Sequence, residues 1–414
     1  MHKAFPKDGH YLFENIAVEE LDPSNQDIFY NNQQELYFER LRKEDPVHFC
    51  KKSEFGPYWS ITKYADIVEI EHNPHLFSAR GGFTIVDIPS DTQFRSFLTM
   101  DPPEHRIRRQ AITPMVSLSN LSSIEDHIFR LVTETLDNLP INEPFDWVER
   151  VSKEMSIKVL ALMMGVPVQD SRLLIRWSDI ASTVPRVGTD IETLDQLYLQ
   201  LQDCYGYFSN LLNQYSSSPA ENNFSAMLAH QAKRENLHPE ELFVTILALI
   251  LAGNETTRHS ITASSLLLHQ FPEQKKLLYS DPSLLKSAAS EIIRLQTPVA
   301  HFRRTATEDI LFRGKEIKKN DKIILWFISA NRDEDEIEYP KEFIINRENP
   351  EHHLSFGSGI HKCIGRNIAL MELKVLWNEI IRRKWHIVPI SEPTRIKSNI
   401  VHGFSSLNVR IKQS

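Results

Sequence analysis

The chain has 414 residues, with 47 Lys and Arg against 55 Asp and Glu, so its net charge at pH 7 is −8. A negative balance disfavours a protein that binds the phosphate backbone of nucleic acids. Hydrophobic residues make up 41% and charged residues 25%, which is ordinary globular usage, so we expect a folded protein with a large core.

The beginning of the chain is polar and does not resemble an export signal. Residues 1–8 include two lysines and an aspartate, and the longest apolar stretch, 242–252, is shorter than the ~20 residues that span a bilayer. Three scattered cysteines, Cys50, Cys204 and Cys363, are too few for a disulfide framework. We therefore expect a cytoplasmic protein.

The hydrophobic pattern predicts a helical middle between two groups of strands. Strand-like alternation occurs at 47–49 and 58–62, apolar residues recur at helical spacing between about 120 and 290, and strand-like segments return at 323–327 and 407–411. We expect a mainly α fold in a single large domain, with a smaller β region in which the strands from the two ends pair.

The longest predicted helix runs from Pro239 to about His269 and has an unusual centre. Its flanks are apolar, but Gly253, Asn254 and Glu255 interrupt them. A buried carboxylate is costly unless it has a partner. A kink or a close helix–helix contact would explain this centre, and so would a functional site.

The clearest chemical signal is the segment 356–365, Phe-Gly-Ser-Gly-Ile-His-Lys-Cys-Ile-Gly. Gly357 and Gly359 allow the backbone to approach a flat, bulky partner. Cys363 lies where the next helix is predicted to begin, and unpaired N–H groups at a helix start favour a thiolate. The pattern predicts that Cys363 is a metal ligand.

Three other interpretations of this segment are weaker. A buried structural cysteine needs no glycine-rich turn. A zinc site could use Cys363 with His352, His353 and His361, but the spacing matches no usual zinc pattern. A cysteine nucleophile with His361 as its base lacks any thiol-protease signature.

The segment resembles the haem-binding loop of the cytochrome P450 family, Phe-Gly-x-Gly-x-His-x-Cys-x-Gly, at every fixed position. Three further segments resemble family motifs in the same order: 101–109 near the haem edge, 252–257 in the oxygen-activating helix, and the Glu-x-x-Arg motif of Glu291 and Arg294. The resemblance covers about residues 40–410, after an extension of about residues 1–39. It implies the cytochrome P450 fold, with haem b buried between two long helices.

The resemblance assigns a role to each motif residue. Cys363 is the axial thiolate ligand, Gly357 and Gly365 shape the loop, and Phe356 shields the sulfur. The haem propionates are assigned to His105, Arg109, His361 and Arg304, with Arg303 as the alternative to Arg304. Glu291 and Arg294 form a structural pair with a third residue, for which Arg347 is preferred to Arg332.

The predicted long helix contributes the catalytic pair Glu255 and Thr256. Splitting dioxygen consumes two protons inside an apolar pocket, so a relay is needed. We expect Thr256 to act near the oxygen and Glu255 to connect it with solvent, while the small Ala252 and Gly253 leave room beside the haem. Peroxide-driven relatives lack this pair.

These assignments predict a haem-thiolate monooxygenase that inserts one atom of O2 into a C–H bond. No flavin or iron–sulfur segment is present, so electrons from NAD(P)H must arrive through separate partners, a ferredoxin and its reductase. Basic residues near the cysteine loop would form the docking patch: Lys362, Arg366, Arg106 and Arg108. The alternative is a haem-based gas sensor or carrier without turnover.

The substrate is predicted to be apolar. The segment 81–98, which includes Ile88 and Phe94, would cap the pocket, and apolar residues near 299 and 401 would approach from other sides. Burial of a hydrocarbon contributes ~25 cal/mol per Å². We expect a steroid, terpenoid or fatty-acyl substrate, in contact with Phe83, Ile85, Val299, Phe302 and Val401.

Overall fold

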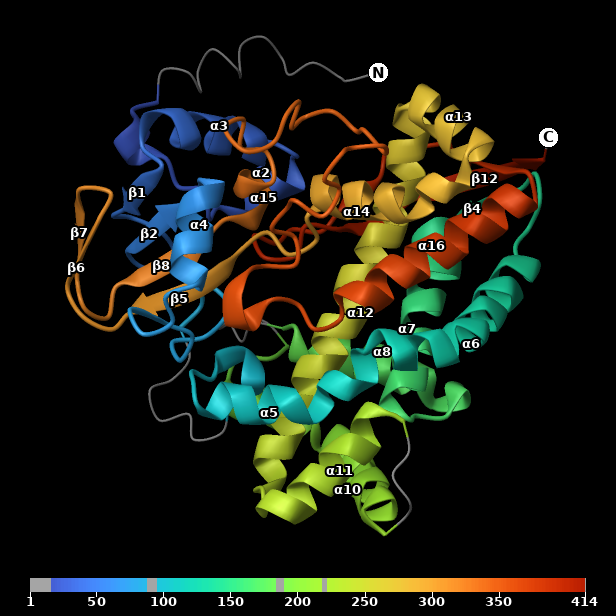
Figure 1. Ribbon diagram of the computed structural model, residues 1–414, viewed down its shortest axis with the longest axis horizontal. Helices are drawn as coiled ribbons and strands as arrows, with labels where there is room; N and C mark the ends of the chain where they lie inside the picture. The colour runs from blue at the N-terminus through green and yellow to red at the C-terminus, as the bar shows by residue number, and fades with distance from the viewer. Residues whose placement is uncertain (1–15, 88–94, 184–189, 218–221, 414) are drawn as a thin grey trace.

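The computed structural model describes residues 16–87, 95–183, 190–217 and 222–413, and helices dominate it (Figure 1). The expected α-rich fold is confirmed. The α-helices are α2 (Gln26–Tyr30), α3 (Gln34–Glu44), α4 (Tyr64–Glu71), α5 (Glu104–Ile112), α6 (Leu118–Asp137), α7 (Glu154–Met164), α8 (Ser171–Ala181), α9 (Leu194–Gln200), α10 (Gln202–Ser216), α11 (Phe224–Glu235), α12 (Pro239–Gln270), α13 (Pro272–Ser280), α14 (Leu285–Gln296), α15 (Phe327–Ala330) and α16 (Arg366–Arg382).

The strands form two main sheets and two hairpin-like pairs. The larger sheet has the order β1-β2-β8-β5-β3, the second has the order β4-β12-β9, and β6 pairs with β7 and β10 with β11. The strands are β1 (Val47–Cys50), β2 (Tyr58–Ile61), β3 (Phe77–Ser78), β4 (Pro144–Asp146), β5 (Phe302–Ala306), β6 (Ile310–Phe312), β7 (Lys315–Ile317), β8 (Lys322–Leu325), β9 (Trp385–Pro389), β10 (Thr394–Arg395), β11 (Phe404–Ser406) and β12 (Asn408–Gln413).

The expected pairing of strands from the two ends of the chain is right for β8 and wrong for β12. β8 lies parallel to β2, with Ser60 opposite Ile324. β12 instead pairs antiparallel with β9, the strand that follows α16, and with β4 from the helical half. The predicted strand at 323–327 also ends early, because α15 begins at Phe327.

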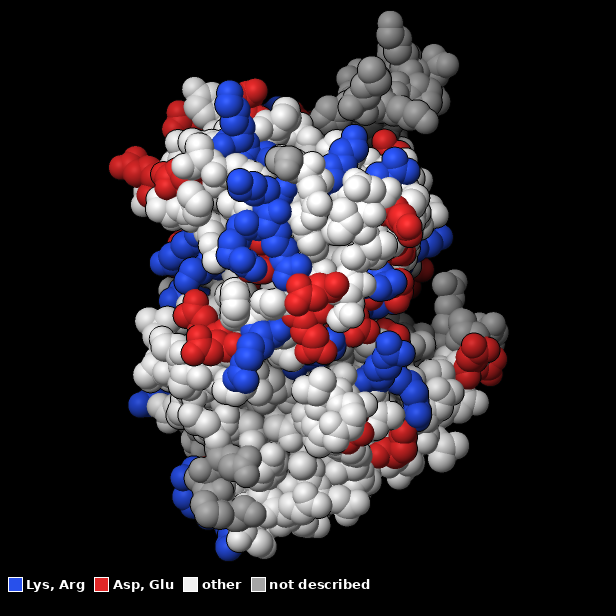
Figure 2. All heavy atoms as spheres, turned by 90° about the vertical axis from the view of Figure 1, so that its right-hand side faces the viewer, with Lys and Arg blue, Asp and Glu red and all other residues white. Residues whose placement is uncertain are grey.

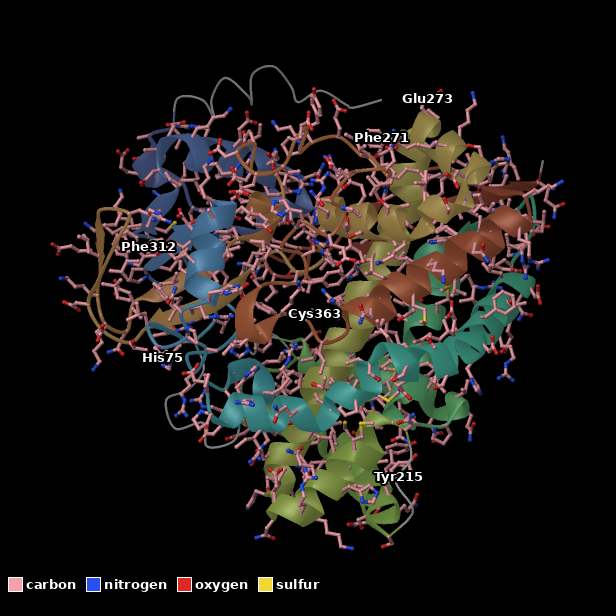
Figure 3. All side chains as sticks on the ribbon, in the orientation of Figure 1. His75, Tyr215, Phe271, Glu273, Phe312 and Cys363 are labelled. Carbon is pink, nitrogen blue, oxygen red and sulfur yellow. The ribbon has the colours of Figure 1, made fainter. Side chains whose placement is uncertain are left out.

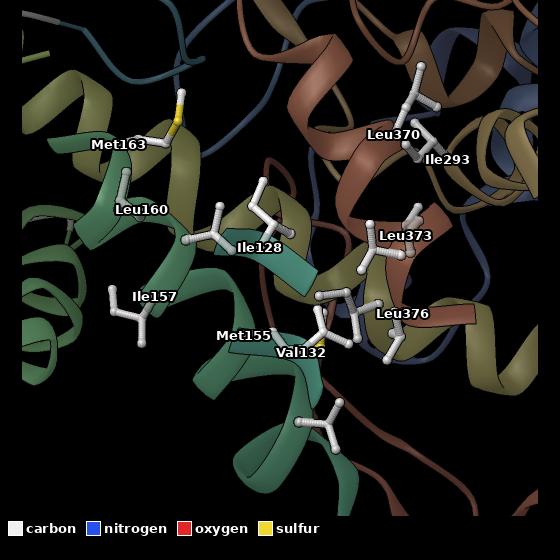
Figure 4. Packing of buried hydrophobic residues seen from close by; sticks show 14 of the residues in the cluster. Ile128, Val132, Met155, Ile157, Leu160, Met163, Ile293, Leu370, Leu373 and Leu376 are labelled. Atoms are coloured by element: carbon white, nitrogen blue, oxygen red, sulfur yellow. The ribbon is translucent and has the colours of Figure 1, made fainter. Parts of the chain in front are cut away.

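Helices α6, α7, α14 and α16 are among those that contribute buried residues to the main hydrophobic core (Figure 4). Val132 of α6, Met155 of α7 and Leu376 of α16 are completely buried there, and Ile293 of α14 is 2% exposed. α12, at 32 residues the longest helix in the described part of the chain, crosses the helical half of the molecule (Figure 1). Burial of such side chains contributes about 1.5–3 kcal/mol each.

The polar centre of α12 is explained in part by its contact with α7. A Cβ atom added to Gly253 would lie 2.7 Å from Cδ1 of Leu160, so the glycine permits close packing of the two helices. The Ser156 hydroxyl of α7 donates to Oδ1 of Asn254 at 3.4 Å. A close helix–helix contact therefore accounts for Gly253. The proximity of Gly253 to the haem stays a prediction.

Part of the segment expected as an N-terminal extension belongs to the folded body. Ile28 and Phe29 of α2 and Phe38 of α3 are buried in a second hydrophobic cluster. The ring centroid of Trp326 lies 6.1 Å from that of Phe29 and 5.1 Å from that of Phe38. These helices therefore cover the end of strand β8.

A buried ion triad fixes the segment before the cysteine loop. Arg294 Nε lies 2.7 Å from Glu291, and Arg347 Nε lies 3.0 Å from the same carboxylate. Arg332, the other candidate, instead lies 3.5 Å from Glu35. Arg294 also donates to backbone carbonyls at 2.7–2.9 Å, those of Asn331, Pro340 and Glu342. The triad joins α14 to the polypeptide between α15 and the cysteine loop.

The surface carries charges of both signs. On the face in Figure 2, Lys and Arg side chains are interspersed with Asp and Glu side chains, as is usual for solvated surfaces. Within the described ranges, none of the helices combines the length and hydrophobicity that crossing a bilayer requires.

We predict that Arg347→Ala lowers the free energy of unfolding by about 3–5 kcal/mol, because it leaves the fully buried Glu291 carboxylate incompletely paired. Chemical denaturation measures the change. Arg382→Ala is the matched control, since Arg382 also pairs with a glutamate, Glu379, but its side chain is 64% exposed. That variant should lose little stability, because an ion pair of an exposed side chain is screened by solvent. Equal losses in the two variants would contradict the role of the triad.

Candidate active site

The cysteine loop turns sharply before α16. Gly357 and Gly359 have φ angles of 64° and 58°, in the left-handed region that favours glycine. A Cβ atom at Gly359 would lie 2.3 Å from the backbone oxygen of Glu71, so the loop packs directly on the end of α4. The N–H of Cys363 donates to the Phe356 carbonyl at 2.7 Å and closes the turn.

Cys363 lies near the centre of the molecule, yet its side chain has accessible surface (Figure 3). Burial raises the pKa of its thiol, while the N–H groups of Gly365 and Arg366 and the charge of Arg109 act in the opposite direction. Cys50 and Cys204 are 2% and 0% exposed, and burial raises the pKa of both thiols. Among the three cysteines, Cys363 has the accessible sulfur.

Two histidines and two arginines from distant segments meet beside this loop. The ring centroids of His105, from α5, and His361 lie 4.3 Å apart. Burial, with the charges of Arg304, His105 and Arg109, lowers the pKa of His361 to about 2. Burial and the charges of Arg109 and Arg304 lower the pKa of His105 to about 4. The cluster thus combines two neutral imidazoles with two guanidinium groups.

Several nitrogen atoms of this cluster lack hydrogen bonds within the described structure. They are Nε2 of His105 and both ring nitrogens of His361. The nearby Met100 backbone raises the pKa of His361 and thus opposes the effect of burial. It does not form a hydrogen bond with either ring nitrogen. Buried polar atoms are normally satisfied, so these atoms suit a polar or anionic group of a bound molecule.

Arg304 and Arg303 point to different parts of the molecule. Arg304 donates to Glu71 at 2.9 Å, and Glu71 also accepts the N–H of Ser358 in the cysteine loop. Arg303 instead forms an ion pair with Asp87 at 2.7 Å. Only Arg304 therefore belongs to the cluster, and Glu71 connects it with the loop. Burial raises the pKa of Glu71 to about 7, although Arg304 opposes this.

The family model described as Cytochrome P450 matches residues 30–412. The chain belongs to the cytochrome P450 family. It is 32% identical over 388 residues, 90% of each chain, to the methyl-branched lipid omega-hydroxylase of Mycobacterium tuberculosis strain ATCC 25618 / H37Rv. It is 29% identical over 412 residues, 95% of this chain and 99% of the other, to the linalool 8-monooxygenase of Pseudomonas putida.

A solved structure has the same fold. CYP153D17 from Sphingomonas sp. PAMC 26605 superposes with a TM-score of 0.91 at 36% identity, covering 96% of this chain and 100% of the other. The expected cytochrome P450 fold is confirmed. The protein is an oxygen-incorporating oxidoreductase, because the named relatives are P450 hydroxylases and monooxygenases.

Cytochrome P450 enzymes carry haem b on a cysteine thiolate, and the residues present fit that group. Cys363 is exposed, and Nε2 of His105 and both ring nitrogens of His361 have no hydrogen-bond partner within the described structure. The zinc ligand set is not assembled: the ring of His352 stacks on that of Tyr64 at 4.8 Å, and His353 lies 3.1 Å from the Ser290 hydroxyl. In the described residues no three His, Cys, Asp or Glu side chains form a metal-binding group.

The pair Glu255 and Thr256 lies in the central turns of α12. The Thr256 hydroxyl donates to the Ala252 carbonyl at 2.8 Å, and Ala252 is exposed although the residues that follow Gly253 are mostly buried. Glu255 lies 2.7 Å from Arg258 and 3.5 Å from Nε2 of His259. Burial raises the pKa of the Glu255 carboxyl, but the hydrogen bond from His259 and the charge of Arg258 outweigh it and lower the pKa.

The predicted substrate residues divide into two groups. The rings of Phe83 and Phe302 meet edge to face at 6.1 Å, and Val299 forms a bridge with Val401. Ile85 is only 1% exposed and packs in the core beside α2 and α3, and its contact with substrate stays a prediction. Ile88 and Phe94 lie outside the described residues.

The expected basic docking residues also differ from one another. Lys362 and Arg106 are exposed, and Arg366 is half-buried, 4.0 Å from Glu351. Arg108 is held by two glutamates, Glu235 and Glu241. Arg108 is therefore not available for docking, because its charge is already paired. The position of Arg108 next to Arg109 in the sequence gave no indication of these two glutamates.

Sequence reasoning missed the residues that hold the site residues in place. They are Glu71 beneath Arg304, Asp87 between Arg303 and Lys322, and Arg258 and His259 around Glu255. Glu71 and Asp87 belong to no motif, so nothing in the sequence indicated them. His259 and Arg258 could have been found, since residues three and four positions after Glu255 share its helical face.

Proposed function

We propose that this cytochrome P450 inserts one atom of O2 into a C–H bond of an apolar substrate, with Cys363 as the haem ligand. The supporting observation is the combination of an accessible cysteine at the centre of the molecule with the His105, Arg109, Arg304 and His361 cluster. A thiolate favours O–O cleavage, which distinguishes oxygen activation from oxygen carriage. The gas-sensor alternative has no support among the named relatives.

Residues of this chain would hold the haem both at its propionates and at the sulfur that binds its iron. The two arginines and two histidines of the cluster match the propionates, since guanidinium groups and unpartnered imidazole nitrogens can donate to carboxylates. The N–H groups of Gly365 and Arg366 act on the sulfur and tune its basicity. Glu71 holds Arg304 in position from behind. Phe356 is half-buried beside α16 and would exclude water from the sulfur.

Proton delivery is assigned to Thr256 and Glu255. The Thr256 hydroxyl donates its one hydrogen to the Ala252 carbonyl, and it would have to rotate that hydrogen away from the carbonyl to donate toward the pocket. The ionised Glu255 would accept a proton from solvent and return it to the relay. Haem iron supplies the chemistry that divides dioxygen, while these side chains supply protons.

We predict that Thr256→Ala uncouples the reaction, so that NADH is still consumed while peroxide rises and product falls about tenfold or more. Glu255→Gln should instead slow NADH oxidation and product formation together, because proton delivery from solvent is lost. Product and peroxide are measured per NADH. Unchanged yields in both variants would show that the relay is elsewhere.

The substrate is proposed to be a steroid, terpenoid or fatty-acyl compound. Phe83, Phe302, Val299 and Val401 are half-buried apolar residues from three segments, as a hydrocarbon-binding wall requires. The relatives named above act on a methyl-branched lipid and on linalool, both hydrocarbon-rich. Electrons are proposed to come from a ferredoxin and its NAD(P)H-dependent reductase, docking near the exposed Lys362 and Arg106.

We predict that lipids, terpenoids or sterols shift the ferric protein to high spin, and that Phe83→Ala weakens that binding about tenfold through lost apolar contact. The dissociation constant from a spectral titration measures the effect. Phe129→Ala is the control, since Phe129 is an exposed aromatic on α6. Binding of small polar aromatics with no response to any of the three classes would contradict the substrate proposal.

A further inference from the structure

His259 of α12 is completely buried and lies one helical turn after Glu255. Its Nδ1 accepts a hydrogen bond from the backbone N–H of Phe404 at 3.2 Å, and its Nε2 lies 3.5 Å from Oε2 of Glu255. The ring thus bridges the proposed relay acid and the segment that begins strand β11.

The contact with Phe404 determines which ring nitrogen carries the proton. A backbone N–H can only donate, so Nδ1 must be the acceptor, and in a neutral imidazole Nε2 then carries the hydrogen. Burial and the charge of Arg258 keep the pKa of His259 below its usual range, although the hydrogen bond to Glu255 opposes them. An Nε2–H then faces Oε2 of Glu255, 3.5 Å away. Nε of Arg258 lies at the same distance, 3.5 Å, from Nε2.

The β11 segment fits closely around this ring. A Cβ atom at Gly403 would lie 2.5 Å from three ring atoms of His259, so the glycine allows the backbone to reach the imidazole. Two residues earlier, Val401 forms its bridge with Val299. The segment that presents Val401 toward the proposed substrate wall is therefore the same segment that orients His259.

The charges around Glu255 come from three elements. Arg258 and His259 belong to α12, Asp179 of α8 lies 4.0 Å from Arg258, and Lys153, from the π-helical turn Val148–Lys153, acts on His259 and Asp179. Asp179 is 59% exposed, so it reaches solvent, whereas His259 has no exposed surface. Arg258 supplies charge to Glu255, and His259 supplies a directed hydrogen bond.

We infer that His259 is a positioning residue for the reaction: its Nε2–H holds the Glu255 carboxylate in place, and Phe404 and Gly403 hold His259. This inference rests on the proposed relay role of Glu255. His259 touches neither substrate nor cofactor and acts through Glu255.

Two substitutions of His259 distinguish the role of Nδ1 from the role of Nε2. His259→Asn keeps an acceptor near Nδ1 for the Phe404 N–H but removes the donor to Glu255, whereas His259→Gln places an amide N–H near the position of Nε2. The experiment uses the haem-loaded protein, these two variants, Glu255→Gln and the double variant His259→Asn/Glu255→Gln. Thermal unfolding of each confirms that it is folded.

The first readout needs no turnover. Infrared difference spectra against Glu255→Gln isolate the Glu255 carboxylate band, and its loss is followed as the pH falls. Because the hydrogen bond from His259 lowers the pKa of Glu255, His259→Asn should protonate Glu255 at higher pH than the natural protein, and His259→Gln should restore the original titration. Equal titrations in all three proteins would overturn the inference.

The second readout is product formed per NADH. His259→Asn should lower the product formed per NADH about threefold or more, which is a part of the ~10²-fold contribution of a general acid–base group. His259→Gln should give a yield near that of the natural protein. In the Glu255→Gln background His259→Asn should add no further loss. A loss that is equally large in that background would overturn the inference alone, since His259 would then act independently of Glu255. No effect of Glu255→Gln by itself would overturn the relay, and the inference with it.

Discussion

The accessible sulfur of Cys363 at the centre of a helical protein constrains the rest of the structure. The sulfur can be presented there because Gly357 and Gly359 adopt left-handed backbone angles and Gly359 packs on the backbone of Glu71. Any side chain at Gly359 would collide with that backbone. The loop, the end of α4 and the start of α16 thus form one unit, on which the position of the metal ligand depends.

The same unit also holds Arg304, one of the residues proposed for the propionates. Glu71 accepts from Ser358 of the loop and from Arg304 of β5, so one buried carboxylate connects the loop with the larger sheet. In α12 a second buried carboxylate, Glu255, lies beside Arg258 and His259. In both places a buried acid is kept by nearby cations and donors, which offset the cost of burying its charge.

Sequence motifs predicted the fold class, the long helix and the cysteine loop, because glycine spacing and helical periodicity are local. They also named His105, Arg109 and His361, which meet only in the folded chain. They also favoured Arg304 over Arg303, whereas their different partners, Glu71 for Arg304 and Asp87 for Arg303, emerge only from the structure. The burial of Ile85, the sheet of β12 and the contact of Gly253 with Leu160 also arise from tertiary packing, which no local pattern encodes.

The absorption spectrum of the reduced protein under carbon monoxide tests the central claim most directly. A thiolate ligand predicts a strongly red-shifted band in the natural protein, retained in Cys50→Ser and Cys204→Ser, whose sulfurs are buried elsewhere, and lost in Cys363→Ser. A band that survives in Cys363→Ser, or that disappears in either of the other two folded variants, would contradict the assignment of Cys363 as the ligand.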